Sequence, residues 1–468
     1  MIAAATERHG AAGASQQVTP SNHRHFDRRG EGTMIKKFLL LFTACLLALG
    51  APRLDAQNPP TLSLQQAEQI ALKNHPQIFA AQYNALASNQ MVREARSAYF
   101  PTAYGSVTGV NGDRNTRLGA GFLSMSRLLS HEGQGITVDQ LITDSGRTPN
   151  LVASSRLAAK AQQQNAQATR YDVLLALNRA YFEVLRAQAL VKVAKETVAE
   201  RNVVYEQVSA MVQNKLKSDL DLSFAKVNLG QAQLLEIKTE DNLKAAQAEL
   251  TRALGLQTAP QYKLLPQSLP PVPPSTSDPL VAEAMQNRPE VASLRFGRES
   301  AYKFEHAERD LSYPTLVVEG DAGYIPLIAQ LTLPHMIPDH YEAAAFNLEV
   351  PIFNGHLFAA RRAAALMKAR AADEKLRNME ERITRDVRSA WADASTGYQR
   401  ISVADEVLSQ SKLAMALAQG RYNLGLASIV ALTQAQLNET EAGIQDVNAR
   451  YDFQDEHAML EYEIGILR

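Results

Sequence analysis

Cysteine is almost absent from this sequence. Among 468 residues the one cysteine is Cys45, and it lies in a segment that we expect to be removed from the mature protein. The mature chain would then have neither a disulfide nor a reactive thiol. This scarcity is compatible with an oxidising compartment, although it does not by itself indicate one.

Aromatic residues and net charge are also low. Aromatic side chains make up 6% of the chain, and the formal net charge is -1 at pH 7. Without a basic surplus there is no electrostatic footprint for a nucleic-acid partner. The long middle segments are rich in Ala, Gln, Leu, Glu and Arg, a composition that is typical of long helices rather than of compact sandwich cores.

A long apolar run is missing beyond the N-terminal region. After residue 56 no stretch of about 18 uncharged apolar residues occurs, so the sequence predicts no transmembrane helix. If the chain spans a membrane, it must do so as a closed β-barrel, because only helices and closed barrels satisfy every backbone group in lipid.

The N-terminal region itself has the pattern of a targeting segment. Residues 34–37 include two lysines, and the short apolar run over 38–49 follows them, so we expect a signal peptide over 34–56 with cleavage after Ala56. Cys45 lies inside the apolar run rather than after it, which argues against lipidation. We interpret residues 1–33 as a non-structural extension from an upstream start codon.

Motifs of common enzyme sites are lacking too. The sequence contains no nucleophile elbow, P-loop or dinucleotide fingerprint. His335, His340 and His356 are not spaced as a structural zinc set, and we interpret the first two as part of a solvated loop between strands. We therefore expect no catalytic residue, no metal and no cofactor, and a protein that is not an enzyme.

What the sequence does contain is a heptad pattern written twice. Small and apolar residues recur at alternating spacings of four and three, which is the seam of a coiled coil. Adding 210 to each number gives a second seam. The positions are Val173, Leu177, Ala180, Val184, Ala187, Val191, Ala194 and Val198, and then Ile383, Val387, Ala390, Ala394, Gly397, Ile401, Ala404 and Leu408. A helical pattern repeated at one offset indicates an internal duplication.

The flanking segments repeat in the same order. The Asn-Arg-Pro sequence at 287–289 matches Asn-His-Pro at 74–76, at an offset of 213. We expect a first repeat over 57–258, a Pro-rich extended linker over 259–279 and a second repeat over 280–468. The elements predicted in the first repeat are a helix over 62–99 that is broken or kinked at 73–76, a β-hairpin over 102–143 with a polar loop between its two strands, and helices over 149–212 and 219–254. Those predicted in the second are a helix, a β-hairpin over 315–352 and helices over 356–422 and 428–465.

The predicted strands have one apolar and one polar face. In the strand over 315–324, Val318 and Ala322 lie on one face and Glu319 lies on the other. Four strands of about ten residues have the length for an outer-membrane barrel but are too few to close one. Because an open edge is not tolerated in lipid, the chain must share its barrel with other copies. Two copies would give eight strands, and three would give twelve.

Four short motifs follow one another along the two repeats. They are Ala-Leu-Lys-Asn-His-Pro at 71–76, Tyr-Phe-Pro at 99–101, Val-Pro-Ile-Phe-Asn-Gly at 350–355 and Arg-Tyr-Asn-Leu-Gly-Leu-Ala-Ser at 421–428. This ordered set, over about residues 61–467, resembles the TolC family of outer-membrane efflux proteins. The resemblance implies a mainly α fold with a small β part. Duplicated long antiparallel coiled-coil helices would form a periplasmic tunnel, and the four strands would join a trimeric 12-stranded transmembrane β-barrel.

The same resemblance implies partners and a role. The chain would be a homotrimer in outer-membrane lipid, docked onto a periplasmic adaptor (membrane fusion) protein and an inner-membrane transporter. It would conduct substrates passively to the exterior in a tripartite efflux or type I secretion system. The alternative, a periplasmic coiled-coil adaptor or scaffold without a pore, stays open, but an adaptor's β-domain need not show strands of this length with an apolar outer face.

The resemblance also singles out the two ends where long helices turn. The family's periplasmic tips carry aspartates and an arginine link between repeats, and Asp221 matches the acidic position of the first repeat. The arginine and the aspartates of the second repeat are missing, because the matching positions are Ala427, Ala431 and Gln434.

We therefore expect the first repeat to supply the acidic ring of the gate. Asp219 and Asp221 would form it, with Lys215 or Lys217 as countercharge. A simpler interpretation is that both aspartates favour the helix dipole in a first turn. The turn expected to dock the adaptor consists of Leu216, Ser218, Gly425, Leu426 and Ser428, although Gly425 also suits an ordinary helix C-cap.

Overall fold

The computed structural model describes residues 60–110, 117–118, 126–127, 131–258, 262–324 and 340–467. The chain divides into two units, Met1–Asn58 and Pro59–Arg468, and all described residues belong to the second. The expected upstream extension and signal peptide therefore lie outside the described residues. So does His335, whereas His340 begins a strand and His356 precedes a helix.

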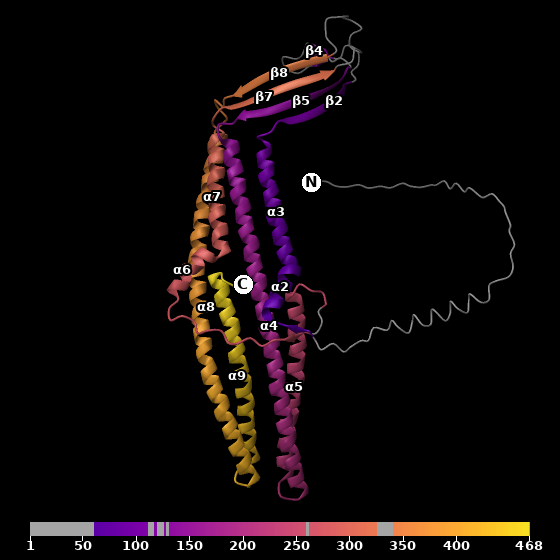
Figure 1. Cartoon of the computed structure of the whole chain (residues 1–468), viewed down its shortest axis with the longest axis vertical. Helices are drawn as coiled ribbons and strands as arrows, with labels where there is room; N and C mark the ends of the chain where they lie inside the picture. The colour runs from indigo at the N-terminus through magenta and orange to yellow at the C-terminus, as the bar shows by residue number, and fades with distance from the viewer. Residues whose placement is uncertain are drawn as a thin grey trace, which may run out of the picture. The chain divides into compact units, whose positions relative to one another are not determined.

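Long helices dominate the described chain (Figure 1). The helices are α2 (Leu64–Asn74), α3 (Pro76–Ser97), α4 (Arg147–Gln213), α5 (Asp219–Ala253), α6 (Asp278–Asn287), α7 (Pro289–Asp310), α8 (Leu357–Asn423) and α9 (Ile429–Ile464). The strands are β1 (Thr61–Leu62), β2 (Thr102–Val110), β3 (Arg117–Leu118), β4 (Ser126–Arg127), β5 (His131–Thr143), β6 (Lys263–Leu264), β7 (Thr315–Tyr324) and β8 (His340–Glu349). None of the described helices has both the length and the apolarity needed to cross a membrane.

Proline breaks the first helix of each repeat at the matching place. His75 and Arg288 have extended backbone, with ψ of 122° and 123°, and each precedes a proline that begins the next helix. A residue before proline is disfavoured in the α region, which explains both breaks. The helix predicted over 62–99 is therefore two helices, α2 and α3, and the predicted break at residues 73–76 is confirmed.

The heptad seams are the inner face of the two long helices. Every seam position on α4 and α8 is buried or half-buried. On α8 most residues between the seam positions are exposed, whereas on α4 many of them are buried as well. The difference arises because most of the α4 seam belongs to the largest apolar cluster, which α2, α5 and the short β1–β6 pair complete. The seams therefore hold the helical wall together within one chain.

The two hairpins form one sheet. Its order is β2-β5-β7-β8, and all three pairings are antiparallel, so β5 of the first repeat pairs with β7 of the second. Strands β2 and β8 are the two edges. Thr137 and Asp139 on β5 face Asp321 and Glu319 on β7, which makes one face polar. The opposite face carries exposed apolar side chains such as Phe346, which is 78% exposed.

Three predicted details of the β part were wrong. β8 ends at Glu349, so Val350 and Ile352 lie beyond the strand that was expected to reach 352. Between β2 and β5, where a loop was expected, β3 and β4 form a further antiparallel pair. A register shift between Leu141 and Thr143 interrupts the alternation expected at Ile142. A β-bulge adds one residue to one strand, so the strict alternation of side chains between the two faces does not predict it.

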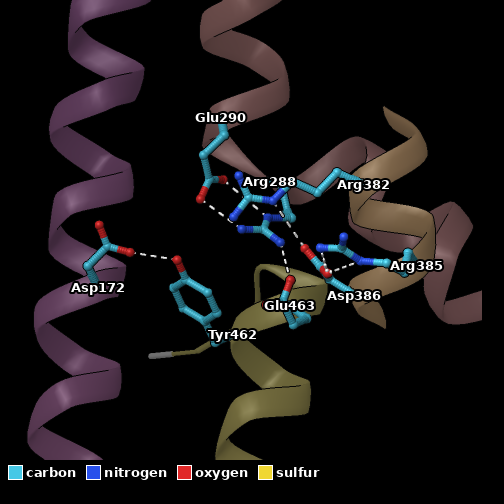
Figure 2. Close-up of polar contacts among 8 residues, drawn as sticks. All are labelled: Asp172, Arg288, Glu290, Arg382, Arg385, Asp386, Tyr462 and Glu463. Atoms are coloured by element: carbon cyan, nitrogen blue, oxygen red, sulfur yellow. Dashed lines mark hydrogen bonds and ion pairs between the residues drawn. The ribbon is translucent and has the colours of Figure 1, made fainter. Parts of the chain in front are cut away.

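A buried charged cluster fixes the break between α6 and α7 (Figure 2). The Arg288 side chain is 8% exposed and forms ion pairs with Glu290, at 2.9 Å, and with the buried Glu463 of α9. Burial alone would lower the pKa of Arg288, but the two carboxylates outweigh it and raise the pKa. Next to this pair, the Tyr462 hydroxyl donates to Asp172 of α4 at 2.6 Å. The cluster therefore joins the end of the second repeat to the long helix of the first.

Candidate functional site

Both long helices end in the same kind of turn. Lys215 and Gly425, which are 210 residues apart, have left-handed backbone with φ of 58° and 73°. Beyond them, the Leu216 amide donates to the Met211 carbonyl and the Leu426 amide donates to the Arg421 carbonyl, both at 2.8 Å. These are the backward hydrogen bonds of a Schellman C-cap. The two turns therefore have the same kind of backbone conformation, with a lysine where the second repeat has glycine.

The helix after each turn begins with a serine cap. In the first repeat, the Ser218 amide donates to the Asp221 carboxylate at 3.1 Å and the Asp221 amide donates to the Ser218 hydroxyl at 3.3 Å. This reciprocal pair is a capping box. In the second repeat Ser428 accepts only from the Ala431 amide, at 3.3 Å. Asp221 is therefore fixed by its cap, whereas Asp219 is exposed at the surface.

Tyr422 joins the two tips. It is 1% exposed, and the Nζ atom of Lys217 lies 4.2 Å from the centre of its ring, a cation–π geometry. Burial and then the charge of Asp221 raise the pKa of Tyr422 to about 12. Its hydroxyl has no hydrogen-bond partner among the described residues. The residues packed with it come from α4, α5 and α9, and they are Val204, Val208, Ala225, Ile429 and Leu432.

The second-repeat positions named from the sequence supply no charge. Ala427 is half-buried and Ala431 is exposed, and the Gln434 side chain donates to Asn438 on its own helix at 2.9 Å. Lys215 is exposed, and among the described residues it forms no ion pair with an acidic side chain. The structure therefore brings Lys217 to Tyr422 of the other repeat, but it does not bring Lys215 to the aspartates.

The turns expose large apolar side chains. Leu216 is 72% exposed and Leu426 is 66% exposed. Their neighbours Leu220, Leu424 and Val430 are 65%, 76% and 57% exposed, and they were not among the docking residues expected from the sequence. Exposed apolar side chains gathered at one end are typical of a contact surface. A search for apolar residues within one helical turn of the predicted tip would have found them.

A buried arginine lies further along the same helices. Arg201 of α4 is 4% exposed, and its Nη2 atom donates to the Gln436 carbonyl at 2.6 Å and to the Thr440 hydroxyl at 2.9 Å. Burial lowers its pKa, against the opposing charges of Glu200 and Glu439. Sequence reasoning missed Arg201, because no local pattern distinguishes a buried arginine from the many exposed ones.

Comparison with known proteins identifies the architecture. The family model described as "Outer membrane efflux protein" matches residues 68–256 and 280–465, which is most of both repeats. The chain belongs to the outer membrane efflux protein family. The two matched segments are separated by residues 257–279.

Relatives and solved structures agree with this family. The outer membrane protein TolC of Vibrio cholerae is 23% identical over 437 residues, covering 92% of this chain and 96% of TolC. A membrane protein of Pseudomonas aeruginosa has the same fold, with a TM-score of 0.75, 18% identity, and coverage of 87% of this chain and 91% of that one. The CmeC outer membrane channel of Campylobacter jejuni has a TM-score of 0.73 and 17% identity, with coverage of 86% of this chain and 85% of that one.

Family membership decides between the two functions left open by the residues. The chain is an outer-membrane efflux channel, with the mainly helical fold and the four barrel strands of that family. The family is one of transport channels rather than of enzymes. The adaptor alternative is not favoured, because the matching model and relatives are outer-membrane proteins.

Proposed function

We propose that this chain is the outer-membrane duct of a tripartite efflux or type I secretion system. It would act as a homotrimer with a periplasmic adaptor and an inner-membrane transporter, after removal of its signal peptide. The observation that carries the proposal is the four-stranded sheet, which has one polar face, one apolar face and two free-standing edges. Because unpaired strand edges are not tolerated in lipid, a sheet of this kind must pair with further strands before it can span a membrane.

Copies of the chain supply those strands. Because successive strands of the sheet are antiparallel, β8 of one copy and β2 of the next would also pair antiparallel. Repeating this pairing closes a barrel, and three copies give twelve strands and a lumen wide enough for a channel. The polar side chains of Thr137, Glu319 and Asp321 then face the lumen, and Phe346 faces lipid.

The helical wall closes in the same way. Along α5, Leu220, Val227 and Leu234 are 65%, 57% and 67% exposed, at a spacing of seven residues. On α8 and at its C-cap, Leu417 and Leu424 are 60% and 76% exposed at the same spacing. A seven-residue apolar spacing is that of a coiled-coil seam that lacks its partner helix. The α8 of a neighbouring copy supplies that partner for α5.

The tips form the gate and the docking surface of the duct. Asp219 and Asp221 supply a ring of carboxylates at the narrow end, and such a ring favours cations. Leu216 and Leu426 of the two turns contact the adaptor, whereas Leu220 and Leu424 belong to the seams between copies. Asp221 also caps its helix, so the dipole interpretation and the gate interpretation apply to the same residue.

Fractionation followed by planar-bilayer recording tests the duct. We expect the full chain in the outer-membrane fraction, and channels in bilayers made with the purified protein. Recovery in the soluble periplasm without channel activity would contradict the proposal and favour the adaptor. N-terminal sequencing of the same material should begin close to residue 57, and finding any of residues 1–33 would contradict the expected processing.

A further inference from the structure

The segment between the two repeats runs across the helices at their middle. After the end of α5, β6 pairs in parallel with β1, and the chain then continues without regular structure to α6 (Figure 1). Residues 262–277 are named the strap here. They were expected to be an extended linker, but several hydrogen bonds hold the strap against α4, α9 and α8.

Tyr181 of α4 holds the first part of the strap. Its side chain is fully buried at 0% exposure, and its hydroxyl lies 2.7 Å from the Leu265 carbonyl and 2.9 Å from the Leu62 carbonyl. The hydroxyl also accepts from the Leu265 amide at 3.2 Å. Burial raises the pKa of Tyr181, so the phenol keeps the proton that it donates. One side chain thus ties β1, β6 and α4 together.

Trp391 of α8 holds the last part of the strap. Its indole nitrogen donates to the Pro274 carbonyl at 2.7 Å. Between the two aromatic residues, the Gln454 amide of α9 donates to the Gln267 carbonyl at 3.4 Å. Tyr181 and Trp391 are 210 residues apart and therefore occupy the same seam-relative position in the two repeats. Trp391 also packs against the apolar cluster of α8 and α9.

The duplicated positions carry matching hydrogen-bond donors. A residue that only packs against a helix does not need a polar atom at a fixed place, whereas each of these two aromatic rings directs its one donor to a strap carbonyl. Between the anchors the strap is exposed, as at Leu269 (42%) and Val272 (60%). Its many prolines make it extended and stiff, so it has little slack.

We propose that the strap is a clamp that holds the α4–α5 hairpin against the α8–α9 hairpin and so restrains the separation of their tips. The proposal rests on the proposed function, because tip separation is what would open the duct. Beyond the strap, polar contacts such as the 2.8 Å hydrogen bond from Asn228 to Thr433 join the hairpins. Contacts of this kind are individually weak, so a restraint at mid-height changes how often they break.

Loosening the strap between its anchors tests the clamp. In one variant Gly-Ser-Gly-Ser is inserted after Ser268, between the Tyr181 and Trp391 anchors. In the matched control the same four residues follow Thr276, beyond Pro274 and before α6. Trp391→Phe and Tyr181→Phe provide a second pair, because each removes one donor and keeps an aromatic ring.

The readout is disulfide formation between Asn228→Cys and Thr433→Cys in a Cys45→Ser background, measured on the full-length assembled protein. We expect the rate to fall about fivefold in each aromatic variant, as expected for the loss of one hydrogen bond. The Ser268 insertion should lower the rate at least as far, because it lengthens the strap between two intact anchors. The Thr276 insertion should leave the rate unchanged. Equal rates in the two insertions, together with unchanged rates in both aromatic variants, would overturn the clamp.

Conductance recorded in parallel separates this proposal from the previous one. Channels in the parent protein with no effect of the strap variants on disulfide rate would reject the clamp and leave the duct standing. A lack of channels in the parent protein would reject the duct, and the disulfide rates would still decide whether the strap holds the hairpins. Oxidised protein should also show fewer large openings than reduced protein.

Discussion

At the scale of single residues, the two tips of one chain have become unlike. The first repeat keeps Asp219 and Asp221, whereas the second has Ala431 and Gln434 at the positions matched to acids. At the tips the cation–π pair of Lys217 with Tyr422 joins the repeats, where the family resemblance implied an arginine link. Charge at the proposed gate therefore comes from one repeat alone.

Neutralising the two aspartates should change ion selectivity. In the double variant Asp219→Asn and Asp221→Asn, the ring loses its charge, while the new amide oxygen at position 221 can still accept from the Ser218 amide. We expect lower preference for cations in planar bilayers and unchanged assembly. Asp241→Asn, an exposed position further along α5, is the control and should have no effect. Unchanged selectivity and conductance in the double variant would reject the gate and leave the dipole interpretation.

The buried pair of Arg288 and Glu463 gives a second prediction at this scale. Arg288→Met should destabilise the protein by about 3–5 kcal/mol, because it leaves a buried carboxylate without its partner. Arg288→Met combined with Glu463→Leu should regain most of that loss. Arg298→Met is a control: its ion pair with Asp373 is exposed, and loss of such a pair should change stability by less than about 1 kcal/mol. Unfolding in detergent measures all four proteins, and a double variant no more stable than the single one would contradict the prediction.

At the scale of elements, the duplicated turns differ in how well their residues suit the backbone. Lys215 has the left-handed conformation that costs an L residue about 1–2 kcal/mol, and Gly425 occupies the matching place without that cost. Among the described residues, no neighbouring atom lies within 4 Å of a Cβ placed on Gly425, so its substitution tests backbone strain alone.

Exchanging the turn residues should therefore move stability in opposite directions. Lys215→Gly should raise the free energy of unfolding, by at most about 1 kcal/mol once the greater freedom of glycine in the unfolded chain is included. Gly425→Ala should lower it by about 1 kcal/mol. Thermal unfolding of the two variants beside the parent protein measures both. A change of the same sign in both would show that side-chain contacts, rather than φ, determine these turns.

At the scale of the whole molecule, one chain provides a third of what the proposed duct requires. The sheet has two edges and the helical hairpins leave apolar seams exposed on α5 and α8. Both incomplete surfaces are satisfied by the same operation, the addition of identical copies around one axis.

Native mass spectrometry of the detergent-solubilised protein should therefore find three copies of the processed chain. We expect a trimer that dissociates when β8 loses its pairing capacity, for example in Phe346→Pro, which removes a backbone donor from an edge strand and adds a rigid ring. Phe346→Ala, which keeps the donor, should remain a trimer. A monomer or dimer in the parent protein would contradict twelve-stranded closure.

Most of what could be predicted in advance came from the helical periodicity of apolar residues and from the positions of prolines. The heptad seams of α4 and α8, the helix breaks before Pro76 and Pro289 and the two serine-capped turns all depend on residues close in the sequence. The candidate site was harder to predict from the sequence. Lys217 and Tyr422 are 205 residues apart, and the strap reaches Trp391 through a backbone carbonyl, which leaves no trace in residue type.

The sequence by itself therefore determined the duplication, the helical periods, the strand faces and the lack of a long apolar run after residue 56. Each of these is a local or periodic property of the residues. Only the tertiary structure decided that β5 pairs with β7, that Arg201 and Arg288 are buried, and that Tyr181 and Trp391 hold the strap. Those features depend on backbone groups and on distances between segments far apart in the chain, and no short-range pattern encodes them.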